Sequence, residues 1–180
     1  EIASCLVGSE MCIRDSTMAA GYLEEGYEDK ISVFDMFFRK IPDGGGFAIM
    51  AGLDTFIDAV ENLKFTPEDI EYLRGTGVFN ERFLDYLSHF ELHCNIWAIP
   101  EGTPIFPREP IVTVEGPSIE CQLLETLLLV TINHQCLVAT KANRIVRSAQ
   151  GRPVMEFGAR RAQGYDAAVY GARALSLIHI

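Results

Sequence analysis

The chain has 180 residues, 48% of them hydrophobic, and its 25 acidic against 15 basic residues give a net charge of −10. This content is sufficient for a packed core, and the length fits one domain, or one domain and part of another. An acidic surface disfavours nucleic acid and anionic membranes as bulk partners, so we expect neither.

Both ends of the chain can be translated from one DNA element in opposite orientations. Leu175–Ile180 fits CTG TCT CTT ATA CAC ATC, whose reverse complement encodes Met11–Asp15 and the start of Ser16. The element resembles the mosaic end of transposon-based sequencing kits. We expect residues 1–16 and 175–180 to be adapter-derived and exclude them from the fold. The remainder carries 22 acidic and 14 basic residues, a net charge of −8.

The first predicted elements after this end are a helix at 17–26 and a strand at 31–40. The strand is rich in β-branched and aromatic residues and ends in Arg39 and Lys40. The glycine-rich stretch 41–46 is expected to be a loop that is free to move. The next helix is predicted from apolar residues that share one face, namely Leu53, Phe56, Ile57 and Val60.

Two capped helices and a small sheet are predicted next. Thr66 is an N-cap followed by Pro67, with an acid at the third helical position, and Asn80 caps a second short helix. After His89 the apolar residues alternate, as in a half-buried strand. The proline-rich stretch 100–117 predicts short strands joined by tight corners. The alternating residues are Leu92, Cys94, Ile96 and Ala98.

A long helix is predicted from Ser118 to Gln150, closed by Gly151. It is apolar nearly all round as far as Ala142, so we expect deep burial. Its most apolar run, residues 123–132, contains Glu125 and is too short to span a bilayer.

A short buried strand at 153–157, a polar turn at 158–165 and a helix from Asp166 complete the pattern. This order predicts an α/β fold: an α+β N-terminal domain at 17–117 and, at 118–174, the start of an α/β barrel or doubly wound sheet. In such folds the loop after a strand carries the chemistry.

Two arginines in that turn are the leading candidates for binding. Arg160 and Arg161 lie beside glycines, and paired guanidinium donors suit phosphate or carboxylate oxygens. A surface ion pair with Glu156 or Asp166 is the ordinary alternative. Phe157 can stack on a flat ring or fill the core.

Other polar candidates are weaker. Arg39 and Lys40 also suit an anion, or simply end a strand in solvent. His89 and His93 have the spacing of one helical turn, but a metal site needs further ligands, so we predict none. His134 is expected to be a hydrogen-bonded core residue. Outside the ends, the cysteines lack CxxC spacing, which indicates reduced, buried thiols; they are Cys94, Cys121 and Cys136.

Familiar catalytic signatures are missing from the sequence. It contains no GxGxxG, no GxxxxGK[ST] and no GxSxG motif. The residues therefore predict neither a Walker loop, nor a standard dinucleotide-binding turn, nor a serine nucleophile.

Five stretches in order resemble the nicotinate phosphoribosyltransferase family and cover essentially all of residues 17–174. They are TMAAGYLEEG, VFDMFFRKIPDGGGFAIMAGL, AIPEGTPIFPREPIVTVEGP, QLLETLLLVTINHQCLVATKANRI and MEFGARRAQGYDAA. The resemblance implies a type II phosphoribosyltransferase, with an N-terminal α/β domain and an irregular α/β barrel. Such enzymes join nicotinate to phosphoribosyl pyrophosphate, giving nicotinate mononucleotide and pyrophosphate, with ATP hydrolysis and Mg²⁺, in NAD salvage. The resemblance also implies a cytoplasmic, head-to-tail homodimer.

The resemblance implies roles for the candidate residues. Phe157 would stack near the pyridine ring, and Arg160 and Arg161 would hold carboxylate or phosphate. Arg39, with Lys40, would reach the phosphates across the dimer.

The sequence departs from the family pattern in two places. The family's Asp-x-Tyr-Gln segment does not precede Thr17, and no histidine matches the one phosphorylated during ATP coupling. We therefore expect an inactive N-terminal fragment with no identifiable catalytic residue. The alternatives are a type II enzyme for nicotinamide or quinolinate, or a non-enzymatic domain that binds a phosphorylated metabolite.

Overall fold

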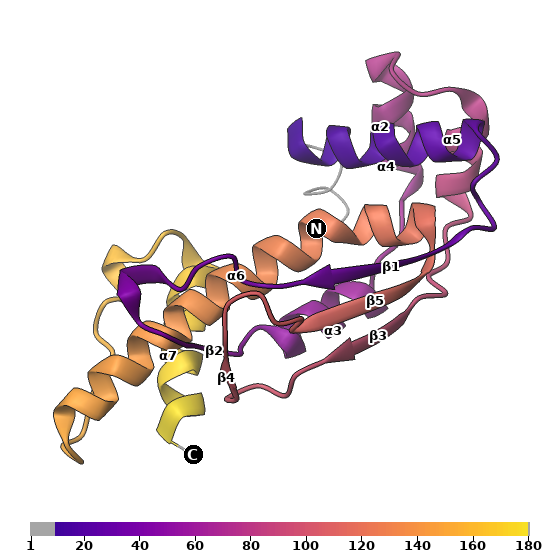
Figure 1. Cartoon of the computed structure of the whole chain (residues 1–180). Coiled ribbons are helices and arrows are strands. Elements are labelled where there is room, and N and C mark those ends of the chain that lie inside the picture. Colours follow the sequence, from indigo (N-terminus) through magenta and orange to yellow (C-terminus); the bar gives the residue numbers. More distant parts are fainter. Residues whose placement is uncertain (1–9, 180) are drawn as a thin grey trace. The chain divides into compact units, whose positions relative to one another are not determined.

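The structure is a computed structural model that describes residues 10–179. These residues form two compact units, each built from three segments: unit 1 from residues up to 35, 54–97 and 113–129, and unit 2 from 36–53, 98–112 and 130 onward. The elements, labelled in Figure 1, are α2 (Glu10–Glu24), β1 (Ile31–Met36), η1 (Pro42–Gly44), β2 (Ala48–Ile49), α3 (Leu53–Glu61), α4 (Pro67–Thr76), α5 (Glu81–Ser88), β3 (Asn95–Ala98), β4 (Pro104–Ile105), β5 (Val112–Pro117), α6 (Ser118–Ala149), η2 (Ala159–Arg161) and α7 (Tyr165–His179).

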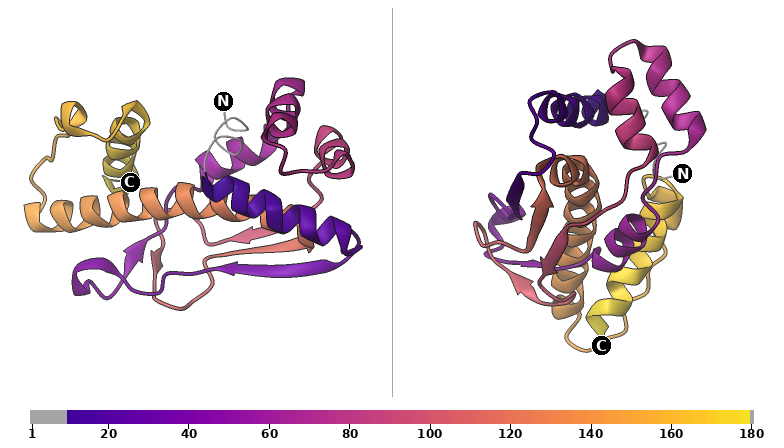
Figure 2. Two further views of the ribbon diagram at one scale, coloured as in Figure 1. Left: turned by 90° about the horizontal axis from the view of Figure 1, so that it is seen from above. Right: turned by 90° about the vertical axis from the view of Figure 1, so that its right-hand side faces the viewer.

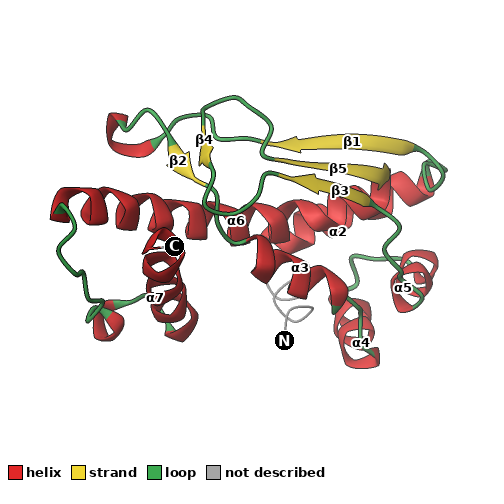
Figure 3. Ribbon diagram, turned by 90° about the horizontal axis from the view of Figure 1, so that it is seen from below, coloured by secondary structure: helices red, strands yellow, loops and turns green. Residues whose placement is uncertain are grey.

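Unit 1 contains a three-stranded sheet in the order β1-β5-β3. The start of α6 lies against one face of this sheet (Figure 3), and residues of β5 alternate between buried and half-buried. The Ser118 hydroxyl fixes the junction, because it lies 2.7 Å from the Ser32 hydroxyl and donates to the Lys30 carbonyl at 2.9 Å. The predicted strand at 31–40 is confirmed as far as Met36.

The two predicted helix caps of unit 1 are confirmed. The Asp69 N–H donates to Thr66 Oγ1 at 3.2 Å, and the Thr66 N–H donates back to Asp69 Oδ2 at 2.8 Å, which completes a capping box. Asn80 Oδ1 accepts from the Phe83 N–H at 2.9 Å. The capped helices α4 and α5 pack together (Figure 2), and α5 buries Phe83, Leu84 and Leu87.

The helix predicted at 17–26 is confirmed, but α2 begins earlier, at Glu10. Asp15 is buried and accepts hydrogen bonds from Gln122 Nε2 at 3.4 Å and from the Thr126 hydroxyl. Residues 1–9 of the expected adapter lie outside the described residues. The fold does not test the DNA origin of the two ends, which stays a prediction.

Unit 2 is built on a two-stranded ribbon and two helices. Strand β2 pairs antiparallel with β4, with Ala48 opposite Ile105 and Ile49 opposite Pro104. The second half of α6 and α7 lie side by side (Figure 1) and share a core with the ribbon. Leu175 and Leu177, which we excluded as adapter, pack against this core; its buried members are Ile49, Ala51, Ala139, Ala142 and Ala174.

The predicted end of α6 is confirmed, because Gln150 and Gly151 have φ of 52° and 81°. The predicted deep burial is wrong for part of the helix, since Leu129 and Val130 are exposed. By length and composition alone α6 is sufficient to cross a membrane, and half of its most apolar window is buried. A buried core helix has the same composition, so this is weak evidence for a span.

Candidate binding turn

The candidate site is the turn between the irregular segment 152–157 and α7, within unit 2. The Arg161 N–H donates to the Gly158 carbonyl at 2.7 Å, and the Ala162 N–H donates to the Ala159 carbonyl at 3.2 Å. These bonds form η2. Gly164, with φ of 98°, then leads into α7, a backbone conformation that favours glycine. The backbone of the turn is therefore held by its own hydrogen bonds.

The buried strand predicted at 153–157 is wrong. This segment has no regular secondary structure, and its apolar side chains face solvent: Met155 is 70% exposed and Phe157 80%. An extended segment becomes a strand only when a neighbour supplies backbone partners. Within residues 10–179, no strand pairs with this segment.

The two arginines of the turn are exposed and hold no charge partner. Within residues 10–179 neither Arg160 nor Arg161 makes a side-chain hydrogen bond or ion pair, so the ordinary alternative is not observed. Glu156 instead accepts a hydrogen bond from the Gly158 N–H. Two guanidinium groups are thus available on one short turn for an anion from outside the chain.

Arg39 and Lys40 are also exposed, after the end of β1. The backbone around them is fixed, because the Arg108 N–H donates to the Phe38 carbonyl and the Ile111 N–H to the Met36 carbonyl, both at 2.8 Å. Lys and Arg side chains only donate hydrogen bonds, so Arg39 and Lys40 could join Arg160 and Arg161 only through a shared anion.

The glycine loop after Lys40 is anchored, contrary to the expectation that it moves freely. Arg144 of α6 donates to the Pro42 carbonyl at 3.2 Å and pairs with Asp43 at 3.3 Å. A Cβ atom on Gly45 would lie only 1.6 Å from the Arg144 guanidinium. Nothing in the local sequence pattern predicted this contact.

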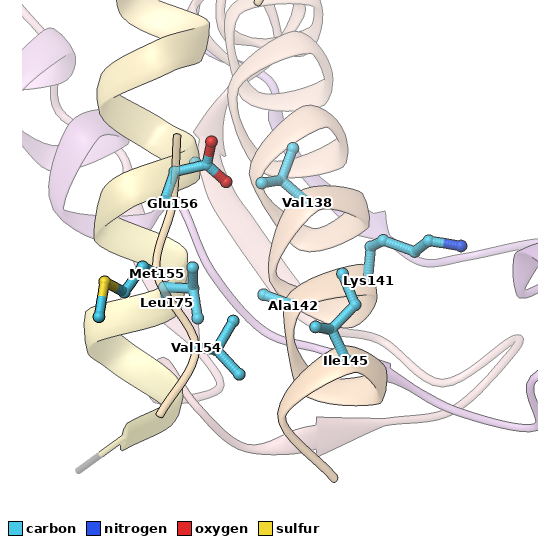
Figure 4. A pocket seen from close by; sticks show the side chains of 9 residues that line it. Val138, Lys141, Ala142, Ile145, Val154, Met155, Glu156 and Leu175 are labelled. Carbon is cyan, nitrogen blue, oxygen red and sulfur yellow. The ribbon is translucent and has the colours of Figure 1, made fainter. Parts of the chain in front are cut away.

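A cavity of about 340 Å³ lies beside the turn (Figure 4). Its charged lining side chains are Lys141 and Glu156, and Lys141 extends away from the α7 side in Figure 4. The rest of the lining that the figure labels is apolar. This lining suits an apolar group rather than a phosphorylated ligand. The exposed arginines of the turn are therefore the better candidates for binding an anion. The apolar side chains are Val138, Ala142, Ile145, Val154, Met155 and Leu175.

Within unit 2, Arg173 of α7 forms an ion pair with Glu101. The Glu101 carboxylate accepts from the Gly52 and Leu53 N–H groups at 2.6 and 2.7 Å and from Arg173 at 2.7 Å. Burial opposes ionisation of Glu101, but the bonds from Arg173 and from the two N–H groups outweigh it and lower its pKa. The sequence did not predict these contacts of Glu101, because Gly52–Leu53, Glu101 and Arg173 lie far apart in the chain.

The histidines do not form a site. His89 Nδ1 lies 3.0 Å from the Asp85 carbonyl oxygen, whereas His93 Nδ1 lies 3.1 Å from Glu120 Oε1. Among the described residues, no group of three or more His, Cys, Asp or Glu is placed to hold a metal. The prediction for His134 is wrong: it is half-buried with its ring edge-on to Tyr170, and no hydrogen bond to it is found in residues 10–179.

Comparison with solved structures defines the fold. The chain matches human nicotinic acid phosphoribosyltransferase with a TM-score of 0.82 and 33% identity, covering 91% of this chain and 33% of that one. It matches nicotinate-nucleotide pyrophosphorylase from Pyrococcus furiosus with a TM-score of 0.67 and 21% identity, covering 96% and 36%. The second match shows the fold alone. The expected α/β class, as found in pyridine-nucleotide enzymes, is therefore confirmed.

Sequence comparison defines the family. The family model for the nicotinate phosphoribosyltransferase (NAPRTase) N-terminal domain matches residues 15–133. Nicotinate phosphoribosyltransferase pncB2 of Mycobacterium tuberculosis (strain H37Rv) is 46% identical over 87% of this chain, and nicotinate phosphoribosyltransferase of Bacillus subtilis (strain 168) is 42% identical over 87%. The chain belongs to the nicotinate phosphoribosyltransferase family, as the five stretches predicted.

These matches cover only part of each relative. The chain spans about a third of the length of the curated relatives, 34% and 32% for the two just named. The family model covers Arg39 and Lys40 but ends before Phe157, Arg160 and Arg161. The roles of all five residues therefore belong to the proposal that follows.

Proposed function

We propose that this chain supplies part of the substrate-binding surface of a nicotinate phosphoribosyltransferase. The reaction joins nicotinate to phosphoribosyl pyrophosphate and releases nicotinate mononucleotide and pyrophosphate, a step of NAD salvage. Family membership and the names of the relatives support the substrates. The observation that carries the proposal is the pair of unpartnered guanidinium groups of Arg160 and Arg161 beside an exposed Phe157.

The chemistry of the substrates fits this turn. Nicotinate is a flat ring with a carboxylate, and phosphoribosyl pyrophosphate carries several phosphate groups. Arg160 and Arg161 offer paired donors for carboxylate or phosphate oxygens, and Phe157 offers a ring face for stacking. Charge-assisted bonds of this kind orient the reacting groups and stabilise the departing pyrophosphate.

Arg39 and Lys40 have a different proposed role. We assign them to the phosphates of a substrate bound by a second subunit of a homodimer, as the family resemblance implies. Their fixed backbone and exposed side chains support this. We propose no nucleic-acid or membrane partner. We propose that the enzyme acts in the cytoplasm.

ATP and Mg²⁺ belong to the full-length enzyme in this proposal. The described residues do not fit either group: no metal-holding cluster is found among them, and no phosphate-binding loop motif is present in the sequence. No step assigned to this chain runs through them. With Phe157 open to solvent, we propose that the 180 residues alone form no nicotinate mononucleotide.

Substrate identity is tested by calorimetric titration of the chain with nicotinate and with nicotinamide, each in the presence of phosphoribosyl pyrophosphate. We expect nicotinate to bind about tenfold or more tightly, because an arginine that faces a carboxylate gains a charge-assisted bond that the amide lacks. The Arg161→Ala and Arg160→Ala variants should reduce this preference. Equal binding of the two pyridines would favour a sister enzyme that uses nicotinamide, and binding of the phosphorylated compound alone would favour a non-enzymatic domain.

A further inference from the structure

Two cysteines from distant parts of the sequence meet inside unit 1. Cys94 immediately precedes β3, and Cys121 lies in the first turn of α6, yet their sulfur atoms are 3.8 Å apart. Both thiols are free. A small movement of either side chain would bring the sulfurs to bonding distance, about 2.05 Å.

The backbone around the pair is held in place. A Cβ atom on Gly116 of β5 would lie 2.9 Å from the Cys94 Cα, so this close approach requires glycine. The Cys121 thiol lies 3.6 Å from the Gly116 carbonyl oxygen. Glycine on the central strand therefore allows Cys94 to approach Cys121.

A buried carboxylate stands beside the pair. Glu120, with a side chain only 5% exposed, accepts from the His93 N–H at 2.6 Å and from the Cys94 thiol at 3.6 Å. This carboxylate is therefore the nearest acceptor that the structure shows for the Cys94 proton.

The two thiols differ in access and in acidity. Cys94 lines an open groove of about 500 Å³, together with Phe90, Glu91 and Ile96, whereas Cys121 is buried. The contact with Cys94 lowers the pKa of Cys121, and the same contact, with burial, raises the pKa of Cys94. The position of Cys121 at the start of a helix also favours its thiolate. A small solute thus reaches Cys94 first, while Cys121 is the better attacking sulfur.

We infer that Cys94 and Cys121 form a dithiol that a small peroxide closes reversibly to a disulfide. In the first step Cys94 gives its proton to Glu120 and its sulfur attacks the peroxide. An S–O bond forms, the O–O bond breaks, and the departing oxygen takes the proton back from Glu120 and leaves as water. In the second step the Cys121 sulfur attacks Cys94, the S–S bond forms, and the sulfenic oxygen leaves as a second water with the Cys121 proton. Hydrogen peroxide is reduced and two thiols are oxidised; a dithiol reductant reverses the change.

Both cysteines belong to unit 1, whereas the proposed substrate turn belongs to unit 2. A transient, redox-sensing disulfide is also compatible with the reducing compartment that the cysteine spacing indicates.

The test is treatment of the full chain with hydrogen peroxide, followed by proteolysis without reductant and mass spectrometry of the peptides. We expect one dominant cross-linked pair, Cys94 with Cys121, which is two hydrogens lighter than the free peptides and is released by dithiothreitol. The Cys94→Ser and Cys121→Ser variants should lose it, and Cys136→Ser, which removes a third buried thiol, should retain it. Glu120→Gln should slow its formation about tenfold or more.

Three results would overturn the inference. The first is that both thiols stay reduced, and the second is that Cys94 proceeds to sulfinic acid while Cys121 remains free. The third is that cross-links form mainly with Cys5 or Cys12. Circular dichroism of each variant before oxidation shows whether it is folded, and an unfolded variant is replaced by the corresponding alanine substitution.

Discussion

Glu101 illustrates how one side chain organises its surroundings. It caps the start of α3 with two N–H bonds and pairs with Arg173 of α7, and only 12% of its side chain is exposed. We expect Glu101→Gln to lower the free energy of unfolding by about 1–3 kcal/mol, because the neutral amide weakens several charge-assisted bonds at once. Urea denaturation at neutral pH measures this loss. The matched control is Glu109→Gln, an exposed acid in the next connection, between β4 and β5.

The same carboxylate predicts a pH dependence. Its folded-state pKa is lowered, so its contribution is fully present above the unfolded value of about 4.3 and is lost as pH falls through the folded pKa. We expect the stability difference between the wild type and Glu101→Gln to shrink below about pH 4.3. A difference that stays constant down to the lowest pH would contradict the ionised pair.

Two glycines should respond in opposite directions to alanine. At Gly45 a Cβ would displace the Arg144 guanidinium, so Gly45→Ala should cost about 0.5–1 kcal/mol through the lost contacts with Pro42 and Asp43. At Gly75, inside α4, a Cβ would meet nothing, so Gly75→Ala should stabilise by about 0.5–1 kcal/mol. Thermal denaturation of both variants compares the signs. Stabilisation at both positions would show that the Arg144 anchor contributes nothing.

Helix α4 depends on the capping box at its start. Thr66→Ala removes the side-chain acceptor and should cost about 1 kcal/mol of stability, whereas Thr66→Ser keeps the hydroxyl and should cost less. Denaturation of the two variants side by side measures the contribution of the cap. Equal losses would indicate that the Thr66 methyl group, rather than its oxygen, matters.

Elements with local signals were predicted well from sequence. The caps at Thr66 and Asn80 and the stop at Gly151 depend on residues within one turn of the helix end, so the pattern alone identifies them. The strand at 153–157 was wrong because a strand requires a neighbour, and composition does not show whether one is present. Likewise, Ile57 is exposed although it shares a predicted apolar face with Phe56, which is buried, since the surroundings decide which side of the helix is covered.

Contacts between distant segments lay beyond sequence reasoning. The Glu101–Arg173 ion pair and the Cys94–Cys121 contact each join residues far apart in the chain, which no helical or strand periodicity could predict. The candidate turn was located correctly as a polar turn before a helix, but the roles of Phe157, Arg160 and Arg161 came from the family resemblance. What the structure adds is that both arginines are exposed and that neither has a charge partner within residues 10–179.

The most direct measurement is a calorimetric titration of the chain with phosphoribosyl pyrophosphate at low and moderate salt. The account predicts saturable binding that the Arg160→Ala/Arg161→Ala double variant weakens about tenfold or more, since it loses paired charge-assisted bonds. Arg152→Ala removes an exposed arginine of the same segment and should leave the affinity unchanged. An absence of saturable binding, or an equal loss in both variants, would contradict the assignment of the turn as the anion-binding site.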